Sequence, residues 1–252
     1  MNGTGALTQN LDVAQLVLYA FWIFFAGLIY YLVRENHREG YPMETDNGVT
    51  VRGFPIPDPK TYKLLHGGEV TVPNDQPSPQ TLNAEPAHRW AGAPLLPTGN
   101  PMLSGVGPGA WADRADRPDL DCDGNLKIMP VRLLPAVGII QGDTDPRGLP
   151  VLGADGAVAG TVADLWMDTA ENLFRYLEVQ LADSPRRVLL PINFARIRRH
   201  QVKVNAVLAK HFADVPGTRL PDVVTLLEEE KIMAYYGAGT LYAVPSRQEP
   251  LL

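Results

Sequence analysis

One stretch near the start of the chain limits its possible folds more than any other. Residues Val13–Val33 read VAQLVLYAFWIFFAGLIYYLV and contain no charged side chain. At ~1.5 Å per residue, a helix of this length crosses the ~30 Å hydrocarbon core of a bilayer. A cleaved signal peptide is the competing interpretation, but it needs a basic segment first and a small-residue cleavage site afterwards. Met1–Asp12 has no Lys or Arg and the run leads into RENHREGYP, so we predict a retained membrane helix.

The charges on either side of this helix predict its orientation. No basic residue precedes it, whereas Arg34, Arg38, Lys60 and Lys63 follow it. Because basic residues favour the cytoplasmic side, we expect the C-terminal bulk of the chain in the cytoplasm. Arg34 and Arg38 would then lie at the lipid headgroups, where they either hold anionic lipid or serve only as topology signals.

Composition removes several classes of function. The helix has no histidine, so it offers no obvious axial ligand for a haem or a chlorophyll. A net charge of −6, without a basic stripe and interleaved aromatic residues, argues against nucleic-acid binding. The single cysteine, Cys122, excludes an internal disulfide and suits a reducing compartment.

The middle of the chain has too much proline and glycine for regular structure. Between Pro42 and Pro150 lie 17 of the 23 prolines, in phrases such as FPIPDPKTY and GAPLLPTGNPM. A solvated linker would not need the apolar residues found here, so we expect residues 40–148 to lie extended over another protein. The pattern LLHGGEVTVP predicts a strand or hairpin within it. The apolar residues concerned are Trp90, Leu95, Leu96, Met102, Leu103, Val106 and Trp111.

A folded domain is predicted over residues 149–252. The segment LPVLGADGAVAGTVADLWMD reads as strand, Asp-Gly turn and strand, and RYLEVQL, RRVLLPINFARI and QVKVNAV read as further strands. Such closely spaced strands predict a small closed or nearly closed antiparallel barrel. A closing helix should begin at the capping box of Thr225 and Glu228 and stop at Gly237. Two segments precede these parts of the chain. Residues 1–11 form the N-terminal segment, and residues 12–39 are assigned to the membrane helix and its cytoplasmic end.

A charged group stands out in the domain. RYLEVQL alternates, and the same parity places Arg175 on the apolar side, beside Asp168 and Glu171. Spacing alone favours a structural ion pair, but buried carboxylates beside a cation can also form a proton relay. Asp121 and Asp123 resemble the start of a calcium loop whose later ligands are missing, so a turn is the better interpretation. We find no nucleotide fingerprint, no nucleophile elbow and no histidines at metal-ligand spacing.

Several motifs in the same order give the chain a family resemblance. They are LDVAQLVLYAFW from Leu11, REGYP from Arg38, PTGNPM from Pro97, DPRGLPV from Asp145, DLWMD with RYLEV, and LLEEEKIMAYYGAGTLYA from Leu226. With these, the chain resembles, nearly end to end, the H subunit of the photosynthetic reaction centre of purple bacteria. The resemblance implies one membrane helix with a periplasmic N-terminus, an extended segment, and a mainly antiparallel cytoplasmic PRC-type barrel with a C-terminal helix.

The resemblance also gives the charged residues a role. The family has an acid in its W-x-D motif, a glutamate three residues on and an arginine four beyond that, near the proton route to the secondary quinone. Asp168, Glu171 and Arg175 match in type and spacing. Some members carry paired histidines at a proton-uptake and metal-binding site where this chain has Asp121 and Asp123. The resemblance therefore implies proton uptake by these carboxylates but does not extend to metal inhibition. His66, in LLHGG, matches a family histidine and is a further candidate for proton transfer.

A non-catalytic accessory subunit follows from these expectations. It would cap the cytoplasmic face of the L and M subunits in the bacterial inner (intracytoplasmic) membrane, with membrane lipids and potentially a cytochrome subunit or light-harvesting proteins as further partners. It would bind no cofactor itself, whereas L and M would hold bacteriochlorophyll, bacteriopheophytin, quinones and non-haem iron. The alternatives are a membrane-tethered PRC-barrel adaptor without a photosynthetic partner and, more distantly, a membrane-anchored hydrolase.

Overall fold

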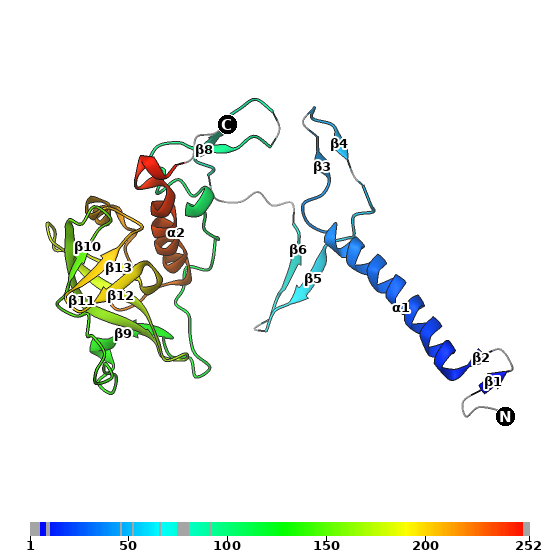
Figure 1. The fold of residues 1–252 in the computed structure, drawn as a ribbon, viewed down its shortest axis with the longest axis horizontal. Helices are drawn as coiled ribbons and strands as arrows, with labels where there is room; N and C mark the ends of the chain where they lie inside the picture. The colour runs from blue at the N-terminus through cyan, green and yellow to red at the C-terminus, as the bar shows by residue number, and fades with distance from the viewer. Residues whose placement is uncertain are drawn as a thin grey trace. The chain divides into compact units, whose positions relative to one another are not determined.

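The computed structural model describes residues 6–8, 11–45, 47–51, 53–65, 67–74, 81–90 and 92–248. The chain divides into two compact units (Figure 1). The first comprises Met1–Pro79 with His88–Pro94 and holds the apolar helix. The second comprises Gln80–Ala87 with Leu95–Leu252 and holds a large sheet and the C-terminal helix.

The apolar run forms a single helix, α1 (Val13–Asn36), as predicted. The side chain of Asp12 caps its start by accepting the backbone N–H of Gln15 at 2.7 Å. None of its described residues is buried, and its mean hydropathy of 2.2 over 18 residues is that of a membrane span. A helix that is apolar on all sides and has no protein cover needs an apolar solvent, which a bilayer supplies.

The rest of the first unit is made of small hairpins attached to the end of α1. Lys60 Nζ lies 2.6 Å from Glu35 Oε2, and Arg38 both pairs with Glu35 at 2.8 Å and donates to the carbonyl of Asp58. The hairpin predicted by LLHGGEVTVP is present as β5 and β6. The strands of this unit are β1 (Ala6–Thr8), β2 (Leu11–Asp12), β3 (Met43–Glu44), β4 (Thr50–Val51), β5 (Lys60–Lys63) and β6 (Glu69–Val72), paired in sequence order.

The second unit contains a seven-stranded sheet in the order β13-β12-β11-β10-β15-β14, with β9 on β11. A separate hairpin, β7 (Ala84–Pro86) with β8 (Leu95–Pro97), precedes it. The sheet strands are β9 (Ile128–Pro130), β10 (Pro150–Leu152), β11 (Val158–Asp168), β12 (Leu173–Leu181), β13 (Arg187–Pro191), β14 (Ala195–Arg198) and β15 (Gln201–Val204).

The sheet differs from the expected barrel in two respects. Within residues 92–248 no ladder joins β13 to β14, so the sheet is not closed. The pairing of β10 with β15 is parallel, because β10 enters beside a strand made fifty residues later in the chain. In addition, β9 comes from the segment assigned to the extended middle and pairs with the C-terminal half of β11.

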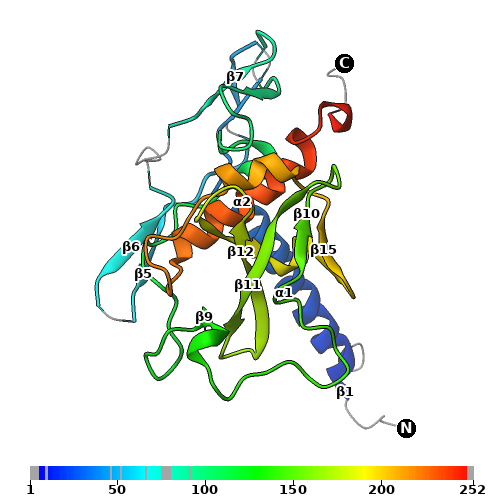
Figure 2. The same cartoon turned by 90° about the vertical axis from the view of Figure 1, so that its left-hand side faces the viewer.

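The C-terminal helix α2 (Leu226–Tyr242) closes the core of this unit (Figure 2). The Thr225–Glu228 capping box forms as predicted, with Glu228 N donating to Thr225 Oγ1 at 3.1 Å and Thr225 N to Glu228 Oε2 at 2.9 Å. Ile232, Tyr235 and Tyr236 are at most 1 % exposed and share one apolar cluster with the inner side chains of the sheet. Burial of these large side chains is what fixes the helix to the sheet.

Gly237 does not stop this helix, which continues to Tyr242, so that expectation was wrong. A Cβ on Gly237 would lie 2.5 Å from the carbonyl oxygen of Pro108, and one on Gly239 would lie 2.4 Å from Val207 Cγ1. These glycines are therefore needed for close approach of the helix to its neighbours and not for a turn.

Two apolar residues of the proline-rich middle face their own unit and not a partner. Met102 and Val106 are 5 % and 6 % exposed, because the 3₁₀ turn Gly107–Gly109 packs on α2. Trp90, Leu95, Leu96 and Leu103 stay at least 40 % exposed. Between Pro42 and Pro150 the described residues contain no α-helix, as the proline and glycine content predicts, but they do form the short strands β3 to β9, which that content did not predict.

Candidate functional site

Asp168 lies at the end of β11 and is only 1 % exposed. Its Oδ1 accepts the backbone N–H groups of Ala170 at 3.1 Å and Glu171 at 3.0 Å, which shapes the turn into β12. Its Oδ2 lies 3.2 Å from Arg175 Nη2 and 3.7 Å from Lys127 Nζ. The buried carboxylate thus accepts hydrogen bonds from two backbone N–H groups and from the Arg175 guanidinium, and Lys127 is a further ion-pair partner. A buried charge requires such partners.

Glu171 completes this group from the solvent side. Its Oε2 lies 2.7 Å from Arg175 Nη2 and its Oε1 lies 3.7 Å from Lys127 Nζ, yet its side chain remains 49 % exposed. Lys127 also lies 3.6 Å from Asp119 Oδ2. We call these residues the Asp168 cluster: Asp119, Lys127, Asp168, Glu171 and Arg175.

Arg175 does not point into the core, so the parity argument was wrong at this residue. Met167 pairs with Phe174 and Trp166 with Tyr176, which leaves Arg175 as an extra, bulged residue of β12. A bulge re-aims a side chain, and the guanidinium is 41 % exposed over the two carboxylates. The local alternation that begins at Tyr176 therefore cannot be extended backwards.

The strand β9 begins directly after Lys127 and so brings this residue beside Asp168. Ile128 pairs with Asp168, and the carbonyl of Lys127 accepts from both the backbone N–H and the hydroxyl of Thr169, at 2.8 and 3.1 Å. The carboxylate of Asp168, more than any other group, raises the pKa of Lys127, so its ammonium stays protonated at neutral pH. With three carboxylates and two cations, the cluster carries a formal charge of −1 when all of them are ionised.

A hydrogen-bonded pair of one tyrosine and one glutamate adjoins the cluster and was not anticipated. The hydroxyl of Tyr176, next to Arg175 in the chain, donates to Glu229 Oε2 at 2.7 Å. Glu229 lies in the first turn of α2. Burial raises the pKa of this carboxyl, which the Tyr176 hydrogen bond partly offsets.

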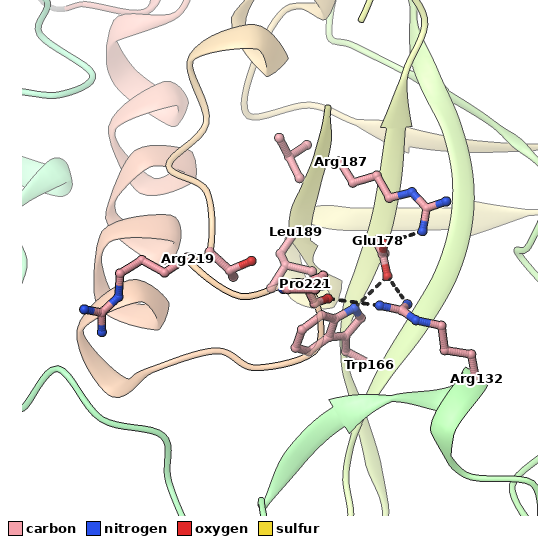
Figure 3. A pocket seen from close by; sticks show the side chains of 9 residues that line it. Arg132, Trp166, Glu178, Arg187, Leu189, Arg219 and Pro221 are labelled. Carbon is pink, nitrogen blue, oxygen red and sulfur yellow. Dashed lines mark hydrogen bonds and ion pairs between the residues drawn. The ribbon is translucent and has the colours of Figure 1, made fainter. Parts of the chain in front are cut away.

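A third charged group, centred on Arg132, was missed altogether (Figure 3). Arg132 Nη1 lies 3.0 Å from Asp164 Oδ2 and also contacts Glu178, while Nη2 contacts Asp222. Glu178 is 4 % exposed and also accepts from Arg187 at 3.0 Å and from the Trp166 indole at 3.0 Å. We call Arg132, Asp164, Glu178, Arg187 and Asp222 the Arg132 network; part of it lines a cavity of about 410 Å³.

The strand pairing holds the signal that could have revealed this network. Asp164 and Glu178 are direct cross-strand partners, and two buried carboxylates side by side need a cation. The alternation in RYLEVQL suggests one covered face, but residues on both faces of β12 are buried. Arg132 lies 32 and 46 residues away in the chain, so its arrival could not be read from local spacing.

Asp121 and Asp123 form a separate turn on the loop that leads to Lys127. Asp121 Oδ1 accepts the backbone N–H groups of Asp123 at 2.9 Å and Asn125 at 2.8 Å. The Asn125 N–H contributes most to lowering the pKa of Asp121, because it stabilises the ionised carboxylate. Among the described residues, no group of three or more His, Cys, Asp or Glu has a metal-holding arrangement.

Comparison with known families decides the relationship of the chain. The family described as the photosynthetic reaction centre, H-chain N-terminal region, matches residues 5–133, about half of the chain. The chain belongs to this H-chain family. The PRC-barrel domain matches residues 141–210, which contain β10 to β15, so the predicted fold class is confirmed although the sheet is open.

Membership makes this H chain a structural subunit of a photosynthetic reaction centre, associated with L and M subunits. Among the described residues, α1 is the one helix long and apolar enough to span a membrane, which agrees with single-pass membrane association. The Asp168 cluster belongs to the matched PRC-barrel domain apart from Asp119 and Lys127, which come from the H-chain region. The cluster therefore joins the two matched parts of the H chain.

The remaining predicted residues of the H chain have different surroundings. Arg34 is exposed and has no ion pair within the described part of the chain. Arg38 is engaged by Glu35 and the Asp58 carbonyl, so its guanidinium is less available to a lipid headgroup. His66 lies outside the described residues.

Proposed function

We propose that this H chain caps the cytoplasmic face of L and M, stabilises the complex, shields its quinone sites and assists proton delivery to the secondary quinone. Family membership supports the partners. Basic residues after α1, and none before it, support a periplasmic N-terminus. In this proposal L and M hold the bacteriochlorophyll, bacteriopheophytin, quinones and non-haem iron. A cytochrome subunit and light-harvesting proteins are further proposed members of the same complex.

The exposed apolar residues of the middle segment support the capping role. Trp90, Leu95, Leu96 and Leu103 are between 40 % and 52 % exposed, in short hairpins and loops with little core of their own. Large apolar side chains that a chain leaves uncovered mark protein or membrane contacts. The surface of L and M would bury them.

The observation that carries the proton role is the contrast between the two carboxylates of the Asp168 cluster. Asp168 is buried, its two oxygens already accept from two backbone N–H groups and from Arg175, and Lys127 pairs with it, so it anchors the cluster. Glu171 is half exposed and can exchange protons with water while its charge stays beside Arg175 and Lys127. Glu171 would therefore collect or pass protons, and the two cations would limit the repulsion between carboxylates.

The test is flash-induced electron transfer in assembled reaction centres carrying Glu171→Gln. We expect the second electron transfer to the secondary quinone, which is coupled to protonation, to slow and to slow further as the pH rises. The first transfer should stay intact. Asp183→Asn is the matched control, because it removes one exposed carboxylate of the same unit outside the cluster. Unchanged second-transfer kinetics at every pH would reduce the cluster to an ion network that shapes the domain.

A further inference from the structure

The hairpin formed by β14 and β15 carries a row of cations that the proton role does not use. Residues 195–204 read ARIRRHQVKV, with four Arg or Lys residues and no acid, in a chain whose net charge is −6. Within the described part of the chain, none of these four cations lies within 4.0 Å of a carboxylate. They are Arg196, Arg198, Arg199 and Lys203.

The strand register puts three of the cations on one face. Arg196 pairs directly with Lys203 and Arg198 with Gln201, whereas Ile197, which is 37 % exposed, pairs with Val202 on the opposite face. Val202 and Val204 are fully buried, which fixes the register and forces the cationic face outward. Like charges placed directly across a strand pair destabilise it. Within the described residues, no carboxylate lies within 4.0 Å of these cations to relieve this penalty.

The composition of the cationic face favours one kind of partner. Its side chains are Arg196, Arg198, Gln201 and Lys203, with no apolar or aromatic residue among them. A specific protein interface usually has an apolar or aromatic centre, which this face lacks. A row of cations without such a centre fits a surface of repeated negative charge, such as a membrane with anionic headgroups.

The membrane anchor of the same chain keeps a lipid surface close to the second unit. The helix α1 anchors the same polypeptide in the bilayer, so the second unit meets the membrane at high effective concentration. We propose that the β14–β15 hairpin is a docking face for anionic lipid headgroups at the membrane surface. The inference rests on the proposed membrane span of α1 and is independent of the proton role of Glu171.

Each cation near an anionic membrane strengthens binding by about fivefold, so three on one face give roughly a hundredfold. The competing explanation is that the charges only protect β14, an edge strand, from pairing with another sheet. Edge protection requires no lipid. The two explanations therefore differ in whether the lipid composition changes the accessibility of these side chains.

Covalent footprinting of the full chain in nanodiscs tests the proposal. Lysine acylation and arginine modification by a dicarbonyl reagent are measured by mass spectrometry in phosphatidylcholine discs and in discs containing phosphatidylglycerol. We expect Lys203, Arg196 and Arg198 to react at least about fivefold more slowly in the anionic discs, and high salt to remove this protection. Lys210 and Arg117, exposed cations of the same unit, are internal controls whose rates should not change.

A variant pair makes the test independent of any single reagent. Arg196→Gln with Arg198→Gln should abolish the protection of Lys203, while Arg117→Gln with Lys210→Gln removes the same charge elsewhere and should leave it intact. Equal modification of the wild-type hairpin in both kinds of disc would overturn the proposal, and this measurement needs no variant to fold. Protection that appears only on assembly with L and M, whatever the lipid, would also overturn it and assign the face to a protein.

Discussion

Two adjacent tyrosines of α2 give opposite predictions for the same substitution. Tyr235 and Tyr236 are 1 % and 0 % exposed, and their rings meet edge to face with centroids 6.0 Å apart. The hydroxyl of Tyr235 donates to the carbonyl of His211 at 2.7 Å. The hydroxyl of Tyr236 is buried and has no hydrogen-bond partner among the described residues. Phenylalanine removes the hydroxyl in either case and leaves the ring.

The expected change in unfolding free energy follows from this difference. Tyr235→Phe loses a hydrogen bond and leaves a carbonyl unpaired, which should destabilise the fold by about 1 kcal/mol. Tyr236→Phe removes an unpaired buried hydroxyl and should stabilise it by about 1 kcal/mol. For a domain of about 150 residues this separates the two melting temperatures by roughly 4–8 °C.

The measurement is thermal unfolding of the detergent-solubilised full chain, followed by near-ultraviolet circular dichroism, with the wild type as reference. Both substitutions replace tyrosine by phenylalanine in the same helix and remove the same volume. The contributions of ring packing and helix propensity to the unfolding free energy therefore largely cancel between the variants. A shift of both melting temperatures in the same direction by the same amount would refute the hydrogen-bond accounting.

Two further changes in α2 are predicted. Gly239→Ala should destabilise the fold by about 1–3 kcal/mol in chemical unfolding, because the new Cβ meets Val207 at 2.4 Å and overpacking outweighs the ~1 kcal/mol gain in helix propensity; a stabilised variant would contradict the packing argument. Burial raises the pKa of Glu229, so the folded state binds its proton more tightly and loses stability as the pH rises above the ordinary value of 4.5. Glu229→Gln should therefore gain stability relative to the wild type between pH 4 and 7, and a difference independent of pH would count against the assignment.

Local patterns predicted the elements whose causes are local. The uncharged run gave α1, and the capping box of Thr225 with Glu228 gave the start of α2. The end of α2 was wrong because Gly237 was treated as a helix stop, whereas its real constraint is the carbonyl of Pro108, more than a hundred residues earlier. A contact of that range leaves no trace in the local sequence.

In the Asp168 cluster, too, the local contacts could be predicted and the distant ones could not. Asp168, Glu171 and Arg175 lie within eight residues and do come together, as the spacing suggested. Lys127 was missing from the predicted group because the pairing of β9 with β11 brings it there. The bulge at Arg175 reversed the predicted direction of its side chain, since one inserted residue changes the parity of everything before it.

The parallel pairing of β10 with β15 has a consequence for synthesis. Leu152 cannot pair with Lys203 until the ribosome has added about fifty more residues. The sheet therefore stays incomplete although most of its strands have already been synthesised. At about 5–20 residues per second, the stretch from Asn36 to Val204 takes roughly ten to thirty seconds to translate. The membrane helix is therefore available for insertion well before the domain can fold, and the order of translation alone favours anchoring first and folding second.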